Sequence, residues 1–342
     1  MITGIEIRGF RGIEKCVLRD LTHVTIIIGK NSSGKSSILE ALYLVSAAIE
    51  PDDPIRRVSK LDYVVSRRGG RGDWDTIRRV LWYVGNTKKP IEIVVEFKGE
   101  RYRFEVHDRP KLESPILLYV DGRPIALDRR GWEEWRVRTV ESEVPQSFVE
   151  LREFIKRVLF IDDVLMRTPK VVEDYAFDEI KSRRLDKEVI KLVKEEFEPS
   201  AEGLSYSPRG YLMLDTSETS IRVDDLADGA RSALLTAMLI YASKPRLVLV
   251  EEPEIHMHPG GLYTYLRFLL RLAKEMEFQV ILSTHSIELI QFVEEISKEM
   301  NVDTTIQFIE REKGIVEVRR ITSKDSELLR KLGIDVKFLY KF

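Results

Sequence analysis

The chain has 342 residues, of which 43% are hydrophobic, so it is long enough for one large domain or two ordinary ones with a buried core. Its 55 Lys and Arg against 57 Asp and Glu give a net charge of −2, which argues against a uniformly basic surface. The single cysteine, Cys16, excludes an internal disulfide framework, and no apolar run is long enough to span a bilayer. We therefore expect a cytoplasmic protein, and its many charges with few Asn and Gln are typical of a thermophile.

The first 50 residues predict a strand, a loop and a helix. Residues 2–7 alternate weakly up to Gly9, and residues 24–28 are a short β-branched run ended by Gly29. Such a run is typical of a strand that helices cover on both faces. A Gly/Ser-rich turn follows it, and then residues 37–49 have helical spacing.

The middle of the chain is more varied. Residues 51–90 are rich in Arg, Asp and Gly, and we expect them to be irregular. Residues 91–97 and 101–106 flank Lys98-Gly99-Glu100, which predicts a hairpin. The remaining expected elements are strands at 116–120, 158–161, 246–250, 279–282, 304–309 and 315–321, helices at 147–158, 226–241 and 261–276, helix-compatible residues at 171–198, and β-like residues at 203–215.

A phosphate-binding loop follows the strand at 24–28. The pattern G-x-x-x-x-G-K-[ST] is matched in full by Gly29-Lys30-Asn31-Ser32-Ser33-Gly34-Lys35-Ser36. The glycines allow a tight turn whose N–H groups converge on an anion, and the next helix adds its positive dipole end. Lys35 can reach the β- and γ-phosphates, and the Ser36 hydroxyl can hold Mg²⁺. The strand before and the helix after support nucleotide binding over a chance match.

Two further strands end in residues that suit this chemistry. The apolar strand at 247–250 leads into Glu251 and Glu252, so the first acid can lie near Mg²⁺ and the second can polarise a water. The strand at 279–282 leads into Ser283-Thr284-His285-Ser286. Open α/β sheets bind ligands at the carboxyl ends of such strands, so His285 can contact the γ-phosphate or the attacking water.

In this order the motifs resemble an ABC-type ATPase head of the SMC/Rad50/RecF and OLD-like group, nearest to the stand-alone AAA15- or AAA21-type heads. Residues 5–13 are similar to the N-terminal strand with its Phe-Arg, and residues 29–37, ending in Ser37, match Walker A. Residues 225–232 resemble the signature loop, residues 251–259 the Walker B acids and D-loop, and residues 283–286 the switch-His loop.

The resemblance implies a fold and a mechanism. The fold is a P-loop α/β head with a mixed core sheet, an antiparallel β subdomain and a short helical lobe. Two heads sandwich two ATP molecules with Mg²⁺, and each signature loop caps the partner's nucleotide. Gly229 then acts in trans and Arg11 contacts phosphate in cis, while Ser36 and Glu251 hold the metal. The catalytic residues that we expect are Lys35, Glu252 and His285.

Three positions depart from the family pattern. Glu251 stands where an Asp is usual, and Ala227 stands where the signature has a Ser. No clear Q-loop is present, because Gln146 lies upstream of the relevant strand and Asp162 or Asp163 occupies the expected place. These departures bear on the hydrolysis rate more than on ATP binding.

Two other groups of residues suggest partners. A basic segment at residues 56–79, with Trp74, Trp82 and Tyr83 close by, is the best candidate for DNA binding. A solvated loop with paired charges is an equal alternative. His256 and His258 have the spacing of a metal pair, but a conformational or interface role in the D-loop is favoured. The basic residues of this segment are Arg56, Arg57, Lys60, Arg67, Arg68, Arg71, Arg78 and Arg79.

We expect three lobes: residues 1–160 with Walker A and the β subdomain, a helical lobe at 161–204, and residues 205–342 with the signature, Walker B and switch-His motifs. The leading hypothesis is an ATP-hydrolysing ABC-type ATPase that forms a homodimer around ATP, as a switch in DNA repair, maintenance or defence. The alternative is an ATP-regulated scaffold that controls a separate nuclease or toxin with little hydrolysis. A transporter subunit is disfavoured, because the chain lacks Leu-Ser-Gly-Gly and a clear Q-loop.

Overall fold

A computed structural model describes residues 1–110, 115–120, 123–125, 127–130, 134–137, 146–255 and 257–321. Its centre is a mixed sheet in the order β12-β16-β17-β3-β18-β19-β2-β1-β6-β7-β8-β9. The first five strands of this order are mutually parallel, and the last five are antiparallel to their neighbours. The strands are β1 (Ile2–Phe10), β2 (Ile13–Leu18), β3 (Val24–Ile28), β6 (Ile91–Phe97), β7 (Glu100–Val106), β8 (Ile116–Val120), β9 (Arg123–Ile125), β12 (Val158–Ile161), β16 (Leu247–Glu251), β17 (Gln279–Thr284), β18 (Thr304–Glu312) and β19 (Ile315–Ile321).

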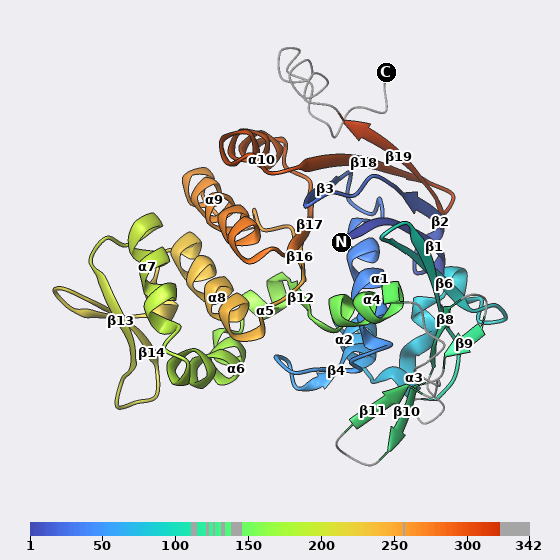
Figure 1. Cartoon of the computed structure of the whole chain (residues 1–342), viewed down its shortest axis with the longest axis horizontal. Coiled ribbons are helices and arrows are strands. Elements are labelled where there is room, and N and C mark those ends of the chain that lie inside the picture. The colour runs from blue at the N-terminus through green and yellow to red at the C-terminus, as the bar shows by residue number, and fades with distance from the viewer. Residues whose placement is uncertain are drawn as a thin grey trace.

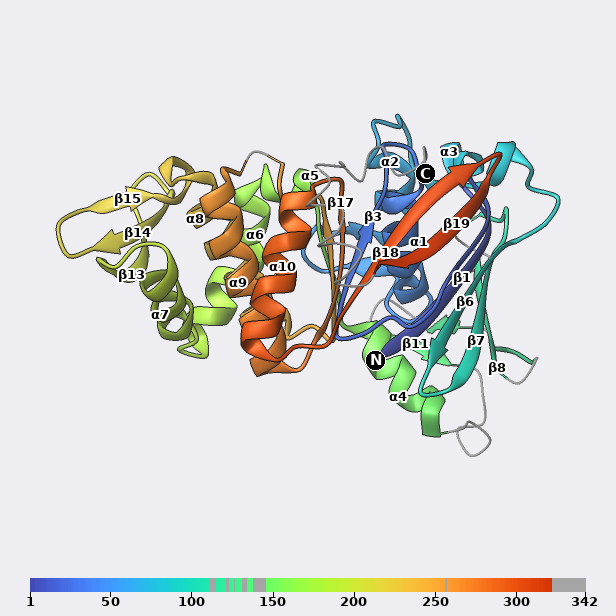
Figure 2. The ribbon, with the colours of Figure 1, turned by 90° about the horizontal axis from the view of Figure 1, so that it is seen from above.

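Helices cover both faces of the parallel part of the sheet (Figures 1 and 2). Helix α1 (Lys35–Ala47) packs on one face, and α8 (Asp228–Ser243), α9 (Pro259–Met276) and α10 (Ile287–Met300) lie on the other. The strands are accordingly apolar on both sides. Ile26 and Ile28 of β3 join the cluster under α8 to α10, whereas Ile27 joins the cluster around α1. This two-sided burial confirms the interpretation of the β-branched runs.

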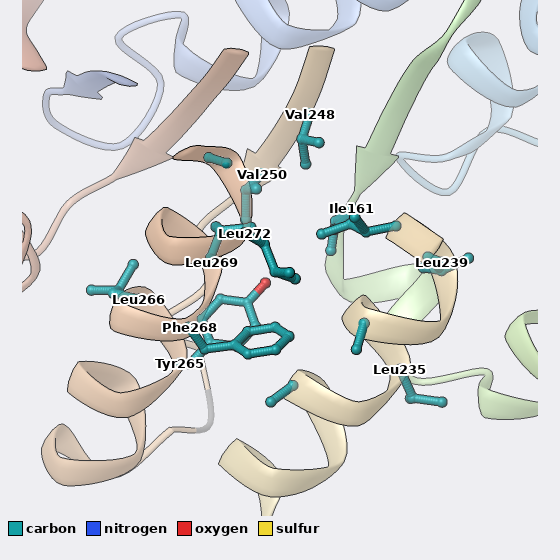
Figure 3. Close-up of a cluster of buried hydrophobic side chains, with 14 of the residues drawn as sticks. Ile161, Leu235, Leu239, Val248, Val250, Tyr265, Leu266, Phe268, Leu269 and Leu272 are labelled. Atoms are coloured by element: carbon teal, nitrogen blue, oxygen red, sulfur yellow. The ribbon is translucent and has the colours of Figure 1, made fainter. Parts of the chain in front are cut away.

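The cluster beneath α8 and α9 is the larger of the two hydrophobic cores. Figure 3 shows side chains from β12, β16, α8 and α9 meeting there. Tyr265 is buried within it, and its hydroxyl lies 3.3 Å from the Thr236 hydroxyl, so this phenol is not left without a polar partner. β16 and β17 both contribute side chains to this core. At their carboxyl ends, Glu251 pairs with Ser283 across the two strands.

A helical lobe with its own small sheet projects from the far side of α8 (Figure 2). It contains α5 (Asp163–Met166), α6 (Pro169–Ser182) and α7 (Asp186–Glu196), and a three-stranded sheet of β13 (Ala201–Tyr206), β14 (Leu212–Thr216) and β15 (Ser220–Arg222). The expected boundary between residues 204 and 205 falls inside β13, which pairs with β14 across it. The short helix η5 (Val223–Asp225) leads from this sheet to α8.

Residues 51–90 are more regular than their composition suggested. They include α2 (Lys60–Ser66), whose first turn is capped by the Ser59 side chain. The remaining short elements are β4 (Asp52–Asp53), β5 (Val58–Ser59), α3 (Trp74–Ile77), η1 (Arg78–Leu81), η2 (Tyr83–Gly85), β10 (Leu127–Arg130), β11 (Glu134–Val137) and α4 (Gln146–Lys156). Among the described residues, none forms a helix both long enough and apolar enough to cross a membrane.

Candidate functional site

The phosphate-binding loop borders a hollow of about 310 Å³ at the carboxyl end of β3. Three of the predicted site residues, Lys35, Ser36 and Glu252, line it, and so do Arg68 and Arg311, which belong to no predicted site. A larger hollow of about 640 Å³ runs along β1 and β2, but none of the predicted catalytic residues lines it. The other residues around the smaller hollow are Gly12, Asn31, Ser32, Gly34 and Ser37.

The backbone of the loop explains its glycines. Gly34 has φ +111°, a conformation that disfavours residues with a side chain, and it immediately precedes α1. A Cβ on Gly29 would lie 2.4 Å from the Ile309 carbonyl oxygen, so only glycine fits where the loop meets β18. The neighbouring Lys30 faces Glu310 at 3.8 Å. The loop is thus held against β18 as well as by its own strand.

Lys35 is folded back onto the loop. Its Nζ donates to the Gly29 carbonyl at 2.9 Å and to the Lys30 carbonyl at 3.2 Å, and it lies 3.5 Å from Glu252 Oε1. Its side chain is only 4% exposed, so the carbonyls and the carboxylate replace the water that it loses. The charge of Lys35 therefore sits directly beside the predicted general base.

Glu252 has an unusual backbone. Its φ is +42°, and its N–H donates to the Ser283 carbonyl at 2.9 Å. A left-handed conformation at a residue with a side chain costs about 1–3 kcal/mol and is concentrated at functional sites. It turns Glu252 out of the strand direction, and its Oε1 lies 3.6 Å from His285 Nδ1. The structure therefore brings together the three predicted catalytic residues, Lys35, Glu252 and His285.

Glu254, which had no predicted role of its own, connects the loops that follow β16 and β17. Its Oε1 accepts hydrogen bonds from the Thr284 hydroxyl and from the His285 N–H, the latter at 3.0 Å. His285 Nδ1 also lies 3.4 Å from the same oxygen. The sequence does show an acid directly after Glu252-Pro253, but only the fold shows that this acid contacts the loop after β17. Glu254 is a positioning residue for His285.

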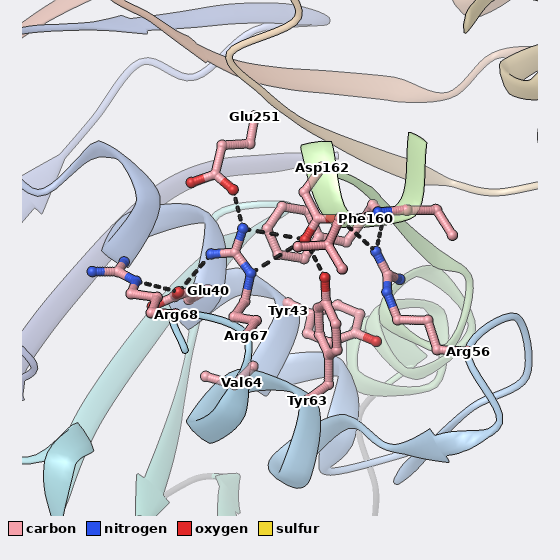
Figure 4. Close-up of polar contacts among 12 residues, drawn as sticks. Glu40, Tyr43, Arg56, Tyr63, Val64, Arg67, Arg68, Phe160, Asp162 and Glu251 are labelled. Atoms are coloured by element: carbon pink, nitrogen blue, oxygen red, sulfur yellow. Dashed lines mark hydrogen bonds and ion pairs between the residues drawn. The ribbon is translucent and has the colours of Figure 1, made fainter. Parts of the chain in front are cut away.

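Glu251 forms an ion pair with Arg67 (Figure 4). Arg67 also binds Glu40 at 2.7 Å and Asp162 at 3.1 Å, so one buried guanidinium joins α1, β16 and the end of β12. Arg67 is only 6% exposed. Glu251 is not among the residues that line the hollow, so in this structure its partner is an arginine.

The same network corrects the DNA hypothesis for part of the basic segment. Arg56 is 7% exposed and pairs with Asp53 at 2.8 Å and Asp162 at 3.1 Å. With Arg67 also buried, neither the nucleic-acid interpretation nor the solvated-loop alternative holds for these two residues. Trp74 and Trp82 are buried as well, so their rings are not exposed for stacking on bases. Arg57, Arg68, Arg71 and Arg79 remain exposed.

Asp162 holds this network to the helical lobe. Burial alone would raise its pKa, but the Arg56 and Arg67 guanidiniums and hydrogen bonds from Tyr63 and Leu165 hold the pKa of Asp162 below its ordinary value of 3.8. Its Oδ1 accepts from the Leu165 N–H at 3.0 Å and caps α5. Asp162, proposed for the Q-loop position, thus reaches the Walker B acid through Arg67 and does not line the hollow.

Arg11, Gly229 and the predicted catalytic residue His285 are also not among the residues that line the hollow, and neither are Gly29, Lys30 and Ser33 of the loop. Arg11 pairs with Glu40 at 2.5 Å, its Nη2 donates to the Val64 carbonyl, and its side chain is 10% exposed. Gly229 is buried, and a Cβ on it would lie 3.2 Å from Gly261 Cα, so it allows α8 and α9 to approach closely. The prediction for His256 lies outside the described residues. His258 uses its Nδ1 to accept from the Gly260 N–H at the start of α9.

The donors at the hollow fit a magnesium–nucleotide complex. Two hydroxyls outside its lining, those of Ser33 and Ser283, are buried and have no hydrogen-bond partner in the part of the chain that the structure describes. Within those described ranges no three His, Cys, Asp or Glu side chains form a metal-holding group. Mg²⁺ needs no such cage, because it usually keeps several waters and binds one or two protein oxygens together with phosphates. Of the residues that line the hollow, Ser36 and Glu252 carry oxygens of this kind.

Comparison with known proteins agrees with this geometry. The family model AAA_21, described as "AAA domain, putative AbiEii toxin, Type IV TA system", matches residues 24–291. An ATP/GTP phosphatase of Helicobacter pylori is 21% identical over 87% of this chain and 89% of its own length. An OLD nuclease of Thermus scotoductus is 23% identical over 84% of this chain, and the match covers 59% of that nuclease.

Solved structures extend the comparison to the fold. A crystal structure of an SMC head bound to the C-winged helix domain of ScpA superposes with a TM-score of 0.60 at 15% identity. The superposition covers 96% of this chain and 99% of that one. At this identity the likeness shows the fold, and the predicted P-loop head with a mixed core sheet is confirmed.

Proposed function

From the premise that the chain belongs to the AAA_21 family of ATPase domains, we propose that it is a switch that dimerises around ATP and is reset by hydrolysis. ATP hydrolysis is its enzymatic activity. The observation that carries the proposal is the position of Glu252, whose carboxylate lies 3.5 Å from Lys35 and 3.6 Å from His285 at the edge of the phosphate hollow. A base, a phosphate-binding cation and a histidine are thereby gathered around one point.

Each of these residues has a task that its geometry supports. Lys35 exchanges its contacts with the loop carbonyls for phosphate oxygens. Ser36 would hold Mg²⁺, together with Glu251 once that acid is released from its ion pair with Arg67. The metal supplies charge neutralisation on the phosphates when it is bound. Glu252 orients the attacking water and accepts its proton, and its left-handed backbone keeps the carboxylate pointed at the hollow. Glu254 keeps His285 in reach of the same point.

A second copy of the chain completes the site in this proposal. The phosphate hollow is lined from the turn between β1 and β2, the loop, the start of α1, Arg68 after α2, Glu252 and β18, with no residue from 225–232 among those that line it. The start of α8 is exposed at Ala227 and Asp228, and its first-turn N–H groups suit an anion. Each α8 therefore caps the nucleotide of the partner, with the backbone around Gly229 as donor. Dimerisation is then driven by ligand binding.

Glu252→Gln tests the proposal. The amide cannot accept the proton, so we expect hydrolysis to fall about a hundredfold or more while ATP binding persists. ATP with Mg²⁺ should then convert the variant to a stable dimer, measured by light scattering after gel filtration. Glu317→Gln, an exposed acid on β19, is the matched control and should behave as the parent. A dimer that forms equally without ATP would contradict the switch.

A second candidate is a regulatory subunit for a separate effector, with little hydrolysis. It is favoured by the ion pair of Arg67 with Glu251, which must be shared or broken before the acid can hold a metal. The OLD nuclease also extends well beyond the matched region. Turnover by the purified chain, with and without duplex DNA, separates the two. Sustained hydrolysis in a physiological buffer supports the switch, and binding without turnover supports the regulatory subunit.

A role on DNA in repair, maintenance or defence is a further part of the proposal. Arg57 and Arg71 are two of the exposed residues of the basic segment and can reach a phosphate backbone. Neutralising both should reduce a salt-dependent affinity for duplex DNA and lower its salt slope. If the intact chain binds no DNA with or without ATP, this part is wrong and the ATP switch is unaffected.

A further inference from the structure

Arg311 brings a charge to the phosphate hollow from the far end of the sequence. It lies on β18, which runs parallel to β3, the strand that leads into the phosphate-binding loop, and Phe308 pairs with Ile28 in that ladder. The next residues of the two strands are in close contact, since the Ile309 carbonyl occupies the space beside Gly29. Arg311 is therefore carried by the strand that buttresses the loop, and its side chain lines the hollow.

The charges around the hollow are not balanced. Lys35 has Glu252 at 3.5 Å, and Arg68 has Glu40 at 2.8 Å. Arg311 donates from Nη1 to the Gly12 carbonyl at 3.0 Å, and within the described residues no carboxylate forms an ion pair with it. A carbonyl carries no net charge, so this guanidinium keeps its full positive charge toward the hollow. A bound polyanion would compensate it.

Gly12 fixes where that guanidinium lies. A Cβ built on Gly12 would be 1.7 Å from Arg311 Nη1 and 3.0 Å from its Cζ. The guanidinium thus occupies the space that any side chain at position 12 would need. Because Gly12 also lines the hollow, its bare backbone both anchors Arg311 and leaves that side of the hollow open.

We propose that Arg311 donates hydrogen bonds to the phosphates of the nucleotide that the loop of the same chain binds. An arginine fork presents paired donors that match phosphate oxygens, and it stays charged at all relevant pH values. A nucleoside triphosphate brings more negative charge than Lys35 alone can compensate. Arg311 is then a binding residue outside the five sequence motifs. The inference rests on the proposed function, because it requires that the hollow binds a nucleotide.

Calorimetry on the full chain tests the contact. The ligands are ADP, which is not hydrolysed at this site, and inorganic tripolyphosphate, which has no base or ribose, both with Mg²⁺. Arg311→Met should weaken both by about tenfold to a hundredfold, the range for a hydrogen bond to a charged group. Arg311→Lys, which keeps the charge but loses the fork, should lose less. Arg319→Met, an exposed arginine on β19, should match the parent.

Gly12→Ala provides a second test that keeps the arginine. The methyl group displaces the guanidinium, so ADP should bind several-fold more weakly than to the parent. In a double-mutant cycle, Gly12→Ala should cost little more once Arg311 is Met, because both changes remove one interaction. Additive losses would mean that the methyl group obstructs the hollow directly, and would overturn the role of Gly12 as the anchor.

The outcomes separate this inference from the proposed function. If the parent binds neither ADP nor tripolyphosphate, the proposed function fails. If the parent binds ADP and Arg311→Met binds it within twofold, only the role of Arg311 fails. A loss for ADP without a loss for tripolyphosphate would place Arg311 on the base or ribose, and would overturn the phosphate contact. The unfolding temperature of each variant without ligand checks that the chain is folded.

Discussion

Glu251 and Glu252 are neighbours in the chain, yet they face different charges. Successive side chains of a strand point to opposite faces, and the left-handed backbone of Glu252 adds to the divergence. Glu251 thus meets Arg67 in a buried network, while Glu252 meets Lys35 at the hollow. The two acids were predictable as a pair from the apolar strand before them. Their different partners were not, because Arg67 is contributed by a segment that looked like a loop.

Arg67→Met tests how much the buried network stabilises the fold. The change removes the cation shared by Glu40, Asp162 and Glu251 and leaves buried acids uncompensated, so the free energy of unfolding should fall by about 3–5 kcal/mol. Urea denaturation measures it, and Arg57→Met is the exposed control. A loss under about 1 kcal/mol would mean that solvent replaces the guanidinium without difficulty.

The pH dependence of the same variant follows from Asp162. Its pKa is lowered in the folded chain, so the pairing stabilises the fold above the ordinary pKa of 3.8, and this stability is lost as the pH falls below about 4 through the folded pKa. Arg67→Met removes one of the guanidiniums that lower the pKa of Asp162, so the pKa of Asp162 in the folded chain should rise toward its ordinary value. The difference between parent and variant should therefore shrink as acid is added, and a constant difference from pH 6 to pH 3 would argue against it.

Among the elements, α8 and α9 meet at two glycines. Gly229 was assigned from the signature motif alone, and the structure adds a packing role, because its Cβ would lie 3.2 Å from Gly261 Cα. Glycine at that point lets the N-terminus of α8 pack directly against α9. Ala227 and Asp228, at the N-terminus of α8, remain exposed. A residue that a motif marks for ligand binding can thus be required by the helix contact as well.

Gly229→Leu tests the helix contact. The side chain has to push against the α9 backbone, so overpacking should lower the free energy of unfolding by about 1–3 kcal/mol. Gly260→Ala is the matched control in α9, since its Cβ would meet only His258 Nδ1 at 3.7 Å, and it should change stability little. Equal stability of Gly229→Leu and the parent, by chemical denaturation, would show that α8 moves aside freely.

The elements also show how far sequence reasoning reaches. The strands at residues 24–28 and 247–250 were predictable because burial on both faces leaves a continuous apolar run. Helix α2 was not, since Arg67 and Arg68 at its end have the composition of a solvated loop, and their partners Glu40, Asp162 and Glu251 are distant in sequence. Arg311 was missed for the same reason, because only the pairing of β18 with β3 brings it to the loop.

For the whole molecule, the proposal requires that each site be divided between two copies. Lys35→Met damages the loop side and Ala227→Arg damages the exposed start of α8, so each variant alone should be inactive. When the two variants are mixed in equal amounts, about half of the dimers contain one copy of each variant. Each of these mixed dimers has one intact site of its two, so about a quarter of the parent ATPase activity should return. Ser243→Arg, at the other end of α8, replaces Ala227→Arg as the control. No recovery on mixing would place the complete site within one chain.

The Arg67 network links cation binding at Glu251 to the anchoring of α2. Glu251 is held by a guanidinium whose other partners belong to α1 and to the end of β12. Any cation that competes for Glu251 therefore changes how firmly α2 is anchored, and any partner that moves α2 changes how readily Glu251 accepts a cation. Linkage requires the two effects to be equal in free energy. A protein that bound α2 would therefore change the affinity of Glu251 for a cation. Cation binding at Glu251 would in turn change the affinity of α2 for that protein.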